Sequence, residues 1–300
     1  EWTGAGAPVG SWSTGGDMVK GRYALAGASN QASTNSLAFG GNFPPGDNLS
    51  ALTESYNGTN WTEVNDMNTA RQNLSGNGIY TSAVAFGGFV PPGNTVTGKT
   101  ESWSGTNWTE TTDLNLARVN MGTSGISNTS ILAFGGDTYP GSNPDRKKAN
   151  TESWNGSNWT EVNDLNNARF VLAGFGTQTS ALAFGGYDFD PTFTAKTESW
   201  NGTNWTNMND MNQARYNLVG AGADNTAGLA IGGTPGSVAL TEEWNGVSWV
   251  ETSDLNDGRD DMAGGGTVTS AIIFGGSPGG VVGTEEWNVP GTVTKTISTD

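Results

Sequence analysis

The chain of 300 residues contains neither cysteine nor histidine. It therefore lacks a thiolate nucleophile, the usual general base and the imidazole ligands of transition metals. Hydrolysis by a Ser-His-Asp or Cys-His arrangement is excluded on the same ground. The 29 acidic residues leave one enzyme chemistry open, cleavage of a glycosidic bond by two carboxylates, although the sequence does not single out a pair. We expect a non-catalytic protein, with a two-carboxylate glycosidase as the alternative.

Arginine is the charged residue with the most regular placement. Six of the seven arginines recur once in every ~45 to 50 residues, and each follows an aspartate by five positions, as Arg169 follows Asp164. We expect a structural ring of Asp–Arg pairs and carboxylate-to-backbone hydrogen bonds that holds the loops between repeats. In the alternative interpretation, the arginines surround a channel mouth and bind an anion or an acidic sugar. The six are Arg22, Arg71, Arg118, Arg169, Arg215 and Arg259.

A second group of candidate ligand-binding side chains lies outside the repeated positions, between each Gly pair and the next Thr-Glu. We call these connections the crown loops: Asn42 to Leu52, Phe89 to Lys99, Asp137 to Asn150, Tyr187 to Lys196, Thr234 to Leu240 and Ser277 to Gly283. The first four are long and carry aromatic residues and cations. Variable loops on a rigid scaffold commonly bind ligands, and aromatic faces suit the stacking of sugars.

We expect a ligand site on the crown loops, centred on the second to fourth repeats, with the basic cluster Arg146-Lys147-Lys148 attracting an anionic group. In the alternative, these are solvated loops with locally packed aromatics. Calcium held by Asp188 and Asp190 is a further alternative, without an EF-hand pattern; no other cofactor is expected. The predicted ligand-binding residues are Phe43, Phe89, Tyr139, Arg146, Lys147, Lys148, Tyr187, Asp188, Phe189 and Phe193.

Each repeat predicts four short strands, which we call a to d. Strand a follows the arginine and is made of small residues, as after Leu172. Strand b is an apolar run that ends at a Gly pair, as in Ser180 to Phe184. Strand c begins at Thr-Glu, as in Thr151 to Trp154, and Asn155-Gly156 supplies a hairpin turn. Strand d then starts with a second Trp, as at Trp159.

A period of this size, built from short strands, is typical of a β-propeller with one blade per repeat. We predict an all-β, six-bladed β-propeller of four-stranded antiparallel blades, formed by residues 1–300 as a single domain. Small residues suit the crowded axis, and the Trp residues fill the wider gaps between the outer strands. The repeats start near residues 22, 71, 118, 169, 215 and 259.

The ends of the chain are expected to share one blade, because an unpaired first or last strand would leave open edges. Ser11 to Thr14 should be the outer strand of the blade that holds Ala271 to Phe274 and Thr284 to Trp287. Glu1-Trp2 would remain from an upstream strand, and Thr292 to Ser298 could compete for the same edge.

The repeat resembles that of the kelch-type β-propellers, which combine a Gly pair, an aromatic residue, a Trp and an Arg about ten positions after that Trp. Trp61 to Arg71, Trp108 to Arg118 and Trp159 to Arg169 fit this pattern. The hairpin from Tyr56 to Trp61 is shorter than is usual in that family. The amino-acid sequence of the repeats is similar to that of kelch-like repeat proteins of marine bacteriophages and environmental bacteria. This second resemblance implies a propeller and no particular chemistry.

The net charge of −16 makes nucleic acid an unlikely partner, because a phosphate backbone would be repelled. No apolar run approaches the ~20 residues that span a bilayer, so we expect no membrane insertion. We predict a binding module, outside a cell or on a virion surface, that recognises a surface glycan or a protein receptor through the crown loops. It could belong to a larger virion or surface assembly. The alternative is a purely structural or decoration module.

Overall fold

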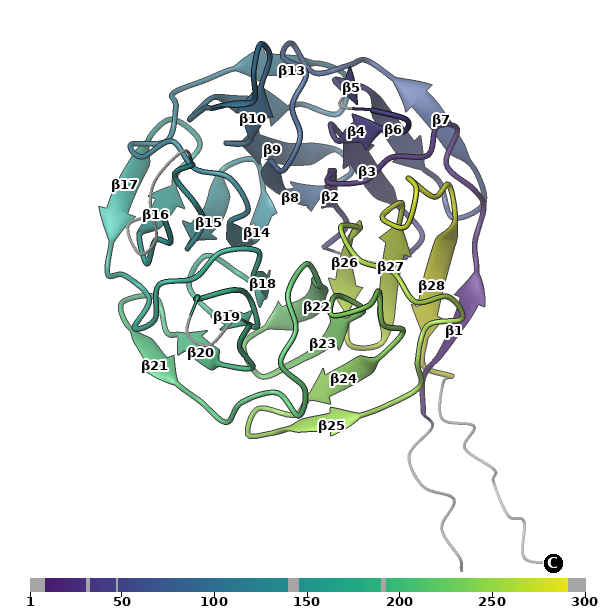
Figure 1. Cartoon of the computed structure of the whole chain (residues 1–300), viewed down its shortest axis with the longest axis vertical. Helices are drawn as coiled ribbons and strands as arrows, with labels where there is room; N and C mark the ends of the chain where they lie inside the picture. Colours follow the sequence, from purple (N-terminus) through teal and green to yellow (C-terminus); the bar gives the residue numbers. More distant parts are fainter. Residues whose placement is uncertain (1–8, 31–32, 47, 140–145, 190–192, 291–300) are drawn as a thin grey trace, which may run out of the picture.

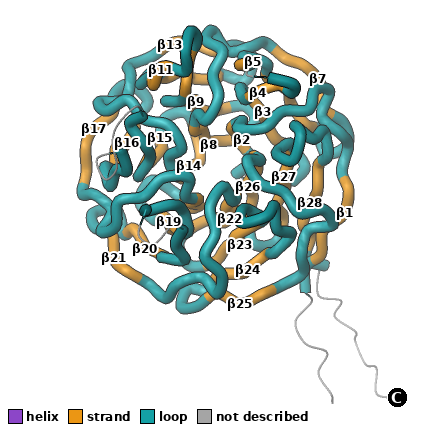
Figure 2. Tube along the Cα trace, viewed as in Figure 1, coloured by secondary structure: helices purple, strands orange, loops and turns teal. Residues whose placement is uncertain are grey.

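The computed structural model describes residues 9–30, 33–46, 48–139, 146–189 and 193–290. Six four-stranded antiparallel sheets surround a central axis as the blades of a propeller (Figure 1). The predicted all-β, six-bladed fold is therefore confirmed. The tube view shows strands joined only by loops and turns in the described part of the chain (Figure 2).

The blades follow the chain order, and each runs from an inner strand a to an outer strand d. Blade 1 comprises β2 (Ala26–Ala28), β3 (Ser36–Phe39), β6 (Thr53–Tyr56) and β7 (Trp61–Val64). Blade 2 comprises β8 (Ser75–Ile79), β9 (Ser82–Phe86), β12 (Thr100–Trp103) and β13 (Trp108–Glu110). Blade 3 comprises β14 (Gly122–Ser127), β15 (Ser130–Phe134), β16 (Thr151–Trp154) and β17 (Trp159–Val162).

The remaining three blades repeat the same order. Blade 4 comprises β18 (Ala173–Gly176), β19 (Ala181–Phe184), β20 (Thr197–Trp200) and β21 (Trp205–Asn207). Blade 5 comprises β22 (Val219–Asp224), β23 (Ala227–Ile231), β24 (Thr241–Trp244) and β25 (Trp249–Glu251). Blade 6 comprises β26 (Ala263–Thr267), β27 (Ser270–Phe274), β28 (Thr284–Asn288) and β1 (Ser11–Thr14).

The ring is closed as predicted, by strands from both ends of the chain. In blade 6, β1 pairs with β28, and Trp12 lies opposite Trp287 with ring centroids 5.5 Å apart. Blade 1 secures this closure, because the Tyr56 hydroxyl donates to Glu286 in β28 at 2.6 Å. Burial and this hydrogen bond to the Glu286 carboxylate raise the pKa of Tyr56 to about 12. Glu1-Trp2 and Thr292 to Ser298 lie outside the described residues.

Tryptophan connects neighbouring blades as well as filling the space between them. The indole N–H of each strand d Trp donates to the hydroxyl of the first Thr of strand c in the preceding blade, at 2.9–3.2 Å. Trp108 and Thr53 illustrate the contact, and both are buried. The six bonds form a complete circle, in which Trp12 of the closing strand bonds to Thr241.

The repeat arginines pair with glutamate, so the predicted Asp–Arg pairs are wrong. Each guanidinium contacts the Glu of Thr-Glu in strand c of its own blade at 2.7–3.0 Å, as Arg169 contacts Glu198. Four of the aspartates instead accept a backbone N–H from strand c at 3.0–3.3 Å, as Asp164 does from Thr151. The expected hydrogen bonds from the backbone to these carboxylates are therefore confirmed for four repeats.

The arginines are also remote from the solvent, so the alternative of an anion-binding arginine ring is wrong. The side chains of five of them have no exposed surface, and that of Arg259 is 6% exposed. Their guanidinium groups bind the carbonyl oxygens at the base of the crown loops. Arg118, for example, donates to the carbonyls of Gly135 and Asn150 at 2.6 and 2.7 Å. The arginines therefore fasten the loops that leave strand b and return to strand c.

The crown loops share one face of the ring with the loops that lead from strand d to strand a. The residue after each repeat arginine forms an antiparallel bridge with the residue after the Gly pair of the same blade, as Phe170 does with Tyr187. Two crown loops also contain short hairpins, formed by β4 (Asn42–Phe43) with β5 (Asn48–Leu49) and by β10 (Phe89–Val90) with β11 (Thr95–Val96). We call this side of the propeller the crown face.

Candidate functional site: an aromatic arc and an axial channel

Aromatic side chains form two groups of ring contacts across the crown face of blades 2 to 5, and we call the two groups together the aromatic arc. It starts with Phe89 and Tyr139, whose ring centroids lie 6.0 Å apart at a near-perpendicular angle of 85°. Its centre is Tyr187, which contacts Phe170 at 5.4 Å and Phe189 at 4.9 Å. The arc comprises Phe89, Tyr139, Phe170, Tyr187, Phe189, Phe193 and Tyr216.

Arg146 lies between the two groups of the arc. Its guanidinium carbon lies 4.9 Å from the ring centroid of Tyr139 and 5.9 Å from that of Phe170. The same group forms an ion pair with the buried carboxylate of Asp137, which raises the pKa of Arg146. A planar guanidinium between two rings stacks well and keeps its charge. Since Asp137 neutralises that charge, Arg146 mainly holds the rings in place.

The other predicted polar residues of this region are also engaged. Lys147 donates to the backbone carbonyl of Asp188, and the Asp188 carboxylate accepts from Lys196 at 3.4 Å. Lys148 is half-buried, and its backbone carbonyl accepts the amide of Arg169 at 3.1 Å. Blades 3 and 4 are therefore joined across the crown by lysine contacts. Asp190, the second candidate calcium ligand, lies outside the described residues.

Phe43 is the one predicted aromatic residue that the structure places apart from the arc. It lies on the crown of blade 1 in β4, where the Lys20 ammonium is 5.3 Å from its ring centroid. Next to it, the Asn42 amide donates to Gln72 at 2.6 Å. The crown of blades 1 and 2 thus carries an amide network, whereas aromatic rings dominate blades 3 and 4.

Two members of the arc, Phe170 and Tyr216, were not predicted from the sequence. Both directly follow a repeat arginine, in the loop from strand d to strand a, and so lie outside the crown loops. The signal was available, because this position holds different residues in different repeats. The six occupants are Tyr23, Gln72, Val119, Phe170, Tyr216 and Asp260.

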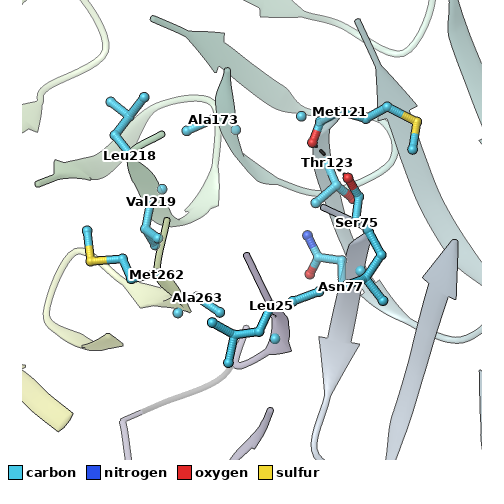
Figure 3. A pocket seen from close by; sticks show the side chains of 18 of the residues that line it. Leu25, Ser75, Asn77, Met121, Thr123, Ala173, Leu218, Val219, Met262 and Ala263 are labelled. Carbon is cyan, nitrogen blue, oxygen red and sulfur yellow. Dashed lines mark hydrogen bonds between the residues drawn. The ribbon is translucent and has the colours of Figure 1, made fainter. Parts of the chain in front are cut away.

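The axis of the propeller holds a second concave site. A cavity of about 140 Å³ runs between the inner strands, and a second of about 110 Å³ lies at its crown end. Figure 3 shows the lining, in which Ser75, Asn77 and Thr123 are polar side chains among small and aliphatic ones. The Thr123 hydroxyl is buried and has no hydrogen-bond partner among the described residues.

One asparagine lies across the far end of this channel. Asn30 belongs to the loop between strands a and b of blade 1, which is longer than its counterparts, and its side chain donates to Asn77 in blade 2 and to the carbonyl of Gly125 in blade 3. A methyl group added at Gly265 of blade 6 would lie 3.4 Å from the Asn30 side-chain oxygen. Asn30 therefore narrows the channel at the face opposite the crown.

The crown end of the channel is framed by six residues, each two positions after a repeat arginine. All six have left-handed backbones with φ between 48° and 56°. The amide of each donates to the carbonyl of its counterpart in the preceding blade, at 2.9–3.3 Å, and these bonds form a closed circle. We call this circle the axial ring. Its members are Ala24, Asn73, Asn120, Val171, Asn217 and Asp261.

Asp261 is the one acidic member of the axial ring. Burial, together with the neighbouring carboxylate of Asp260, raises the pKa of Asp261 from 3.8 to about 6. A carboxyl group whose pKa is raised by folding destabilises the fold as the pH rises through this interval, and the loss is complete above it. The difference in pKa corresponds to about 3 kcal/mol. Asn217, at the equivalent place in blade 5, has the same backbone conformation without this penalty.

We expect Asp261→Asn to raise the free energy of unfolding by about 2–3 kcal/mol at pH 8 and by only about 1 kcal/mol at pH 4.5. Urea denaturation followed by tryptophan fluorescence measures both values. Asp257→Asn is the matched control, since it removes one charge from an exposed position nearby. An equal gain at the two pH values would show that the pKa of Asp261 is not raised.

One segment matches a nucleotide-binding spacing without its structural context. Gly93 to Thr100 reads Gly-x-x-x-x-Gly-Lys-Thr, the pattern of a phosphate-binding loop. Such a loop uses the N-terminus of a following helix, whereas here β12 follows. The Lys99 ammonium is bonded to Glu110 at 3.1 Å. We therefore assign no phosphate site to this segment.

Among the described residues, no group of three or more acidic side chains could hold a metal ion. In the same part of the chain, no helix has the length and apolar character needed to cross a membrane. Comparison of the sequence with models of known protein families gives no match, and comparison with curated proteins gives none either. The structure establishes a six-bladed β-propeller, and its function has to be argued from the two sites described above.

Proposed function

We propose that the protein is a non-catalytic binding module whose crown face recognises a surface glycan or a protein receptor. The observation that carries the proposal is the aromatic arc over blades 2 to 5. Tyr139 is 44% exposed although its ring contacts both Phe89 and the Arg146 guanidinium. Aromatic surfaces held rigidly in this way supply contact area at little cost in side-chain entropy.

Stacking is a better basis for recognition here than net charge. Arg146 is paired with Asp137, and Asp188 is paired with Lys196. A ligand with flat apolar faces and hydroxyl groups, such as a sugar, matches rings edged by these paired polar groups. We therefore favour a glycan over a protein receptor.

The setting that we propose is outside a cell or on a virion surface, where the propeller could form part of a larger assembly. Two resemblances of the sequence support this setting and the kelch-type assignment: the spacing from Trp61 to Arg71, and the similarity to repeats of marine bacteriophages and environmental bacteria. A rigid ring that presents variable loops on one face suits such display.

Tyr139→Ala is expected to weaken glycan binding at least about tenfold, because an exposed aromatic residue that stacks on a ligand commonly contributes more than 1 kcal/mol. A glycan array identifies the ligand, and calorimetry then measures the affinity. Replacing the loop Tyr187 to Lys196 with Thr234 to Leu240, which lacks aromatic residues, should abolish binding while the fold is retained.

Tyr80→Ala is the matched control for this test. Tyr80 is 39% exposed and lies in the hairpin between strands a and b of blade 2, on the opposite face. Its replacement should leave the affinity unchanged. Equal binding by wild-type protein and both crown variants would remove the crown face from consideration. Release of free sugar from the bound glycan would instead identify the two-carboxylate glycosidase.

A further inference from the structure

The axial ring combines an anionic side chain with a cavity that opens to the crown face. Asp261 lines the 110 Å³ cavity together with Asn73, Asn120 and Asn217. The backbone of Asp261 donates to the carbonyl of Asn217, so these two residues are neighbours in the ring. Asn73 and Asn120 are bonded to each other through their side chains at 2.9 Å. In the described part of the chain, this is the one hydrogen bond that joins two side chains of the axial ring, so it does not include the Asp261 carboxylate or the Asn217 side chain.

Backbone conformation accounts for the asparagines but not for the aspartate. Asn and Asp are the residues other than glycine that adopt left-handed conformations most readily. Asparagine would serve at position 261 as it does in three other blades. The aspartate instead places a negative charge in a confined space. Uncompensated acids in concave sites commonly mark binding sites.

The groups that face Asp261 do not neutralise it. The Asp260 carboxylate accepts from the hydroxyls of Thr234 and Ser237 at 3.0 and 2.6 Å, and both of these partners are neutral. Tyr216 lies close enough for Asp260 and Asp261 to contribute to the raised pKa of its phenol, after burial. The Arg259 guanidinium is bonded to Glu285. The local charge is therefore negative, and an anionic ligand is disfavoured.

We propose that the crown end of the axial channel binds one ammonium or guanidinium group, with the Asp261 carboxylate as its counter-ion and the Asn73, Asn120 and Asn217 side chains as polar neighbours. A primary ammonium presents three hydrogen-bond donors to these oxygens. Calcium takes six to eight oxygen ligands and usually several carboxylates, whereas the ring supplies one. This site is separate from the aromatic arc, so its existence does not depend on glycan recognition.

Titration of the isotope-labelled protein with n-butylammonium, at constant ionic strength and pH 8, tests this site by NMR. We expect saturable shifts of the side-chain amide signals of Asn73, Asn120 and Asn217. Asp261→Asn should bind at least about tenfold more weakly, and its spectrum reports at the same time whether it is folded. Asp257→Asn, which removes an exposed acid, should behave as wild type.

Two further measurements, the pH dependence and a comparison of probes, distinguish binding of an ammonium group at Asp261 from binding of calcium. Protonation of Asp261, whose pKa is about 6, should weaken the binding of n-butylammonium about tenfold at pH 5 relative to pH 8. Stronger binding of a Gly-Lys-Gly peptide would indicate a basic side chain of a protein as the natural occupant, and preference for the free amine would indicate a small molecule. Saturation by CaCl2 but not by n-butylammonium, or equal affinity of Asp261→Asn, would overturn the proposal.

Discussion

Arg169→Ala is expected to lower the free energy of unfolding by about 3–5 kcal/mol, because it leaves a charged partner buried and unpaired. Glu198 has no exposed side-chain surface. Its carboxylate would retain the backbone amides of Asn166 and Asn167, at 2.7 and 3.3 Å, but lose its counter-ion. The Ala183 carbonyl would also lose a donor at the base of the crown loop. Chemical denaturation measures the loss.

Two variants show whether the cause is the unpaired charge. Adding Glu198→Gln to Arg169→Ala should restore part of the stability, since the remaining group is then neutral. Lys99→Ala breaks an ion pair in which both side chains are exposed, by 41% and 58%, and it should lower the stability less than Arg169→Ala does. A loss below about 1 kcal/mol for Arg169→Ala would contradict the role assigned to the buried pairs.

Trp12→Ala should lower the free energy of unfolding by about as much as Arg169→Ala does, and it should also release the strand that closes the ring. Removing a buried Trp commonly lowers stability by about 3–5 kcal/mol, and Trp12 also supplies the indole N–H that bonds to Thr241. β1 is attached to blade 6 only through β28. Its release would expose the edge of β28 and invite pairing with another chain.

Trp108→Ala is the control, because Trp108 is buried to the same degree and makes the equivalent bond to Thr53. Its strand, β13, follows β12 directly through a short hairpin and should stay paired. Hydrogen exchange should therefore show selective loss of protection in β1 and β28 for Trp12→Ala alone. Equal protection patterns in the two variants would mean that ring closure does not depend on Trp12.

The repeat allowed most of the fold to be predicted from the sequence. Strand c of blade 3 was expected at Thr151 to Trp154 and is found there. The predicted closure by Ser11 to Thr14 also agrees with the structure. Such agreement has a physical cause, since one blade cannot bury its faces alone and every repeat must therefore satisfy the same contacts.

The periodicity does not show which of two repeated residues forms a contact when both could form it. Asp164 and Glu198 both recur with Arg169, and sequence spacing favoured the nearer one although the fold brings the farther one into contact. The contacts of residues that depart from the repeat were still harder to predict. Phe170 joins the aromatic arc only because the two kinds of crown-face loop lie side by side, and Asn30 reaches the axis only because its loop is long.

Asn30 also determines what the propeller can transmit. Because its side chain reaches from blade 1 to Asn77 in blade 2 and to Gly125 in blade 3, it narrows the axis at the face opposite the crown. If that face were attached to a larger body, the narrowing would hinder the passage of solutes larger than water between that body and the crown. Small rotations of the blades, which are hydrogen-bonded to one another around a full circle, would then provide a mechanical connection between the two faces.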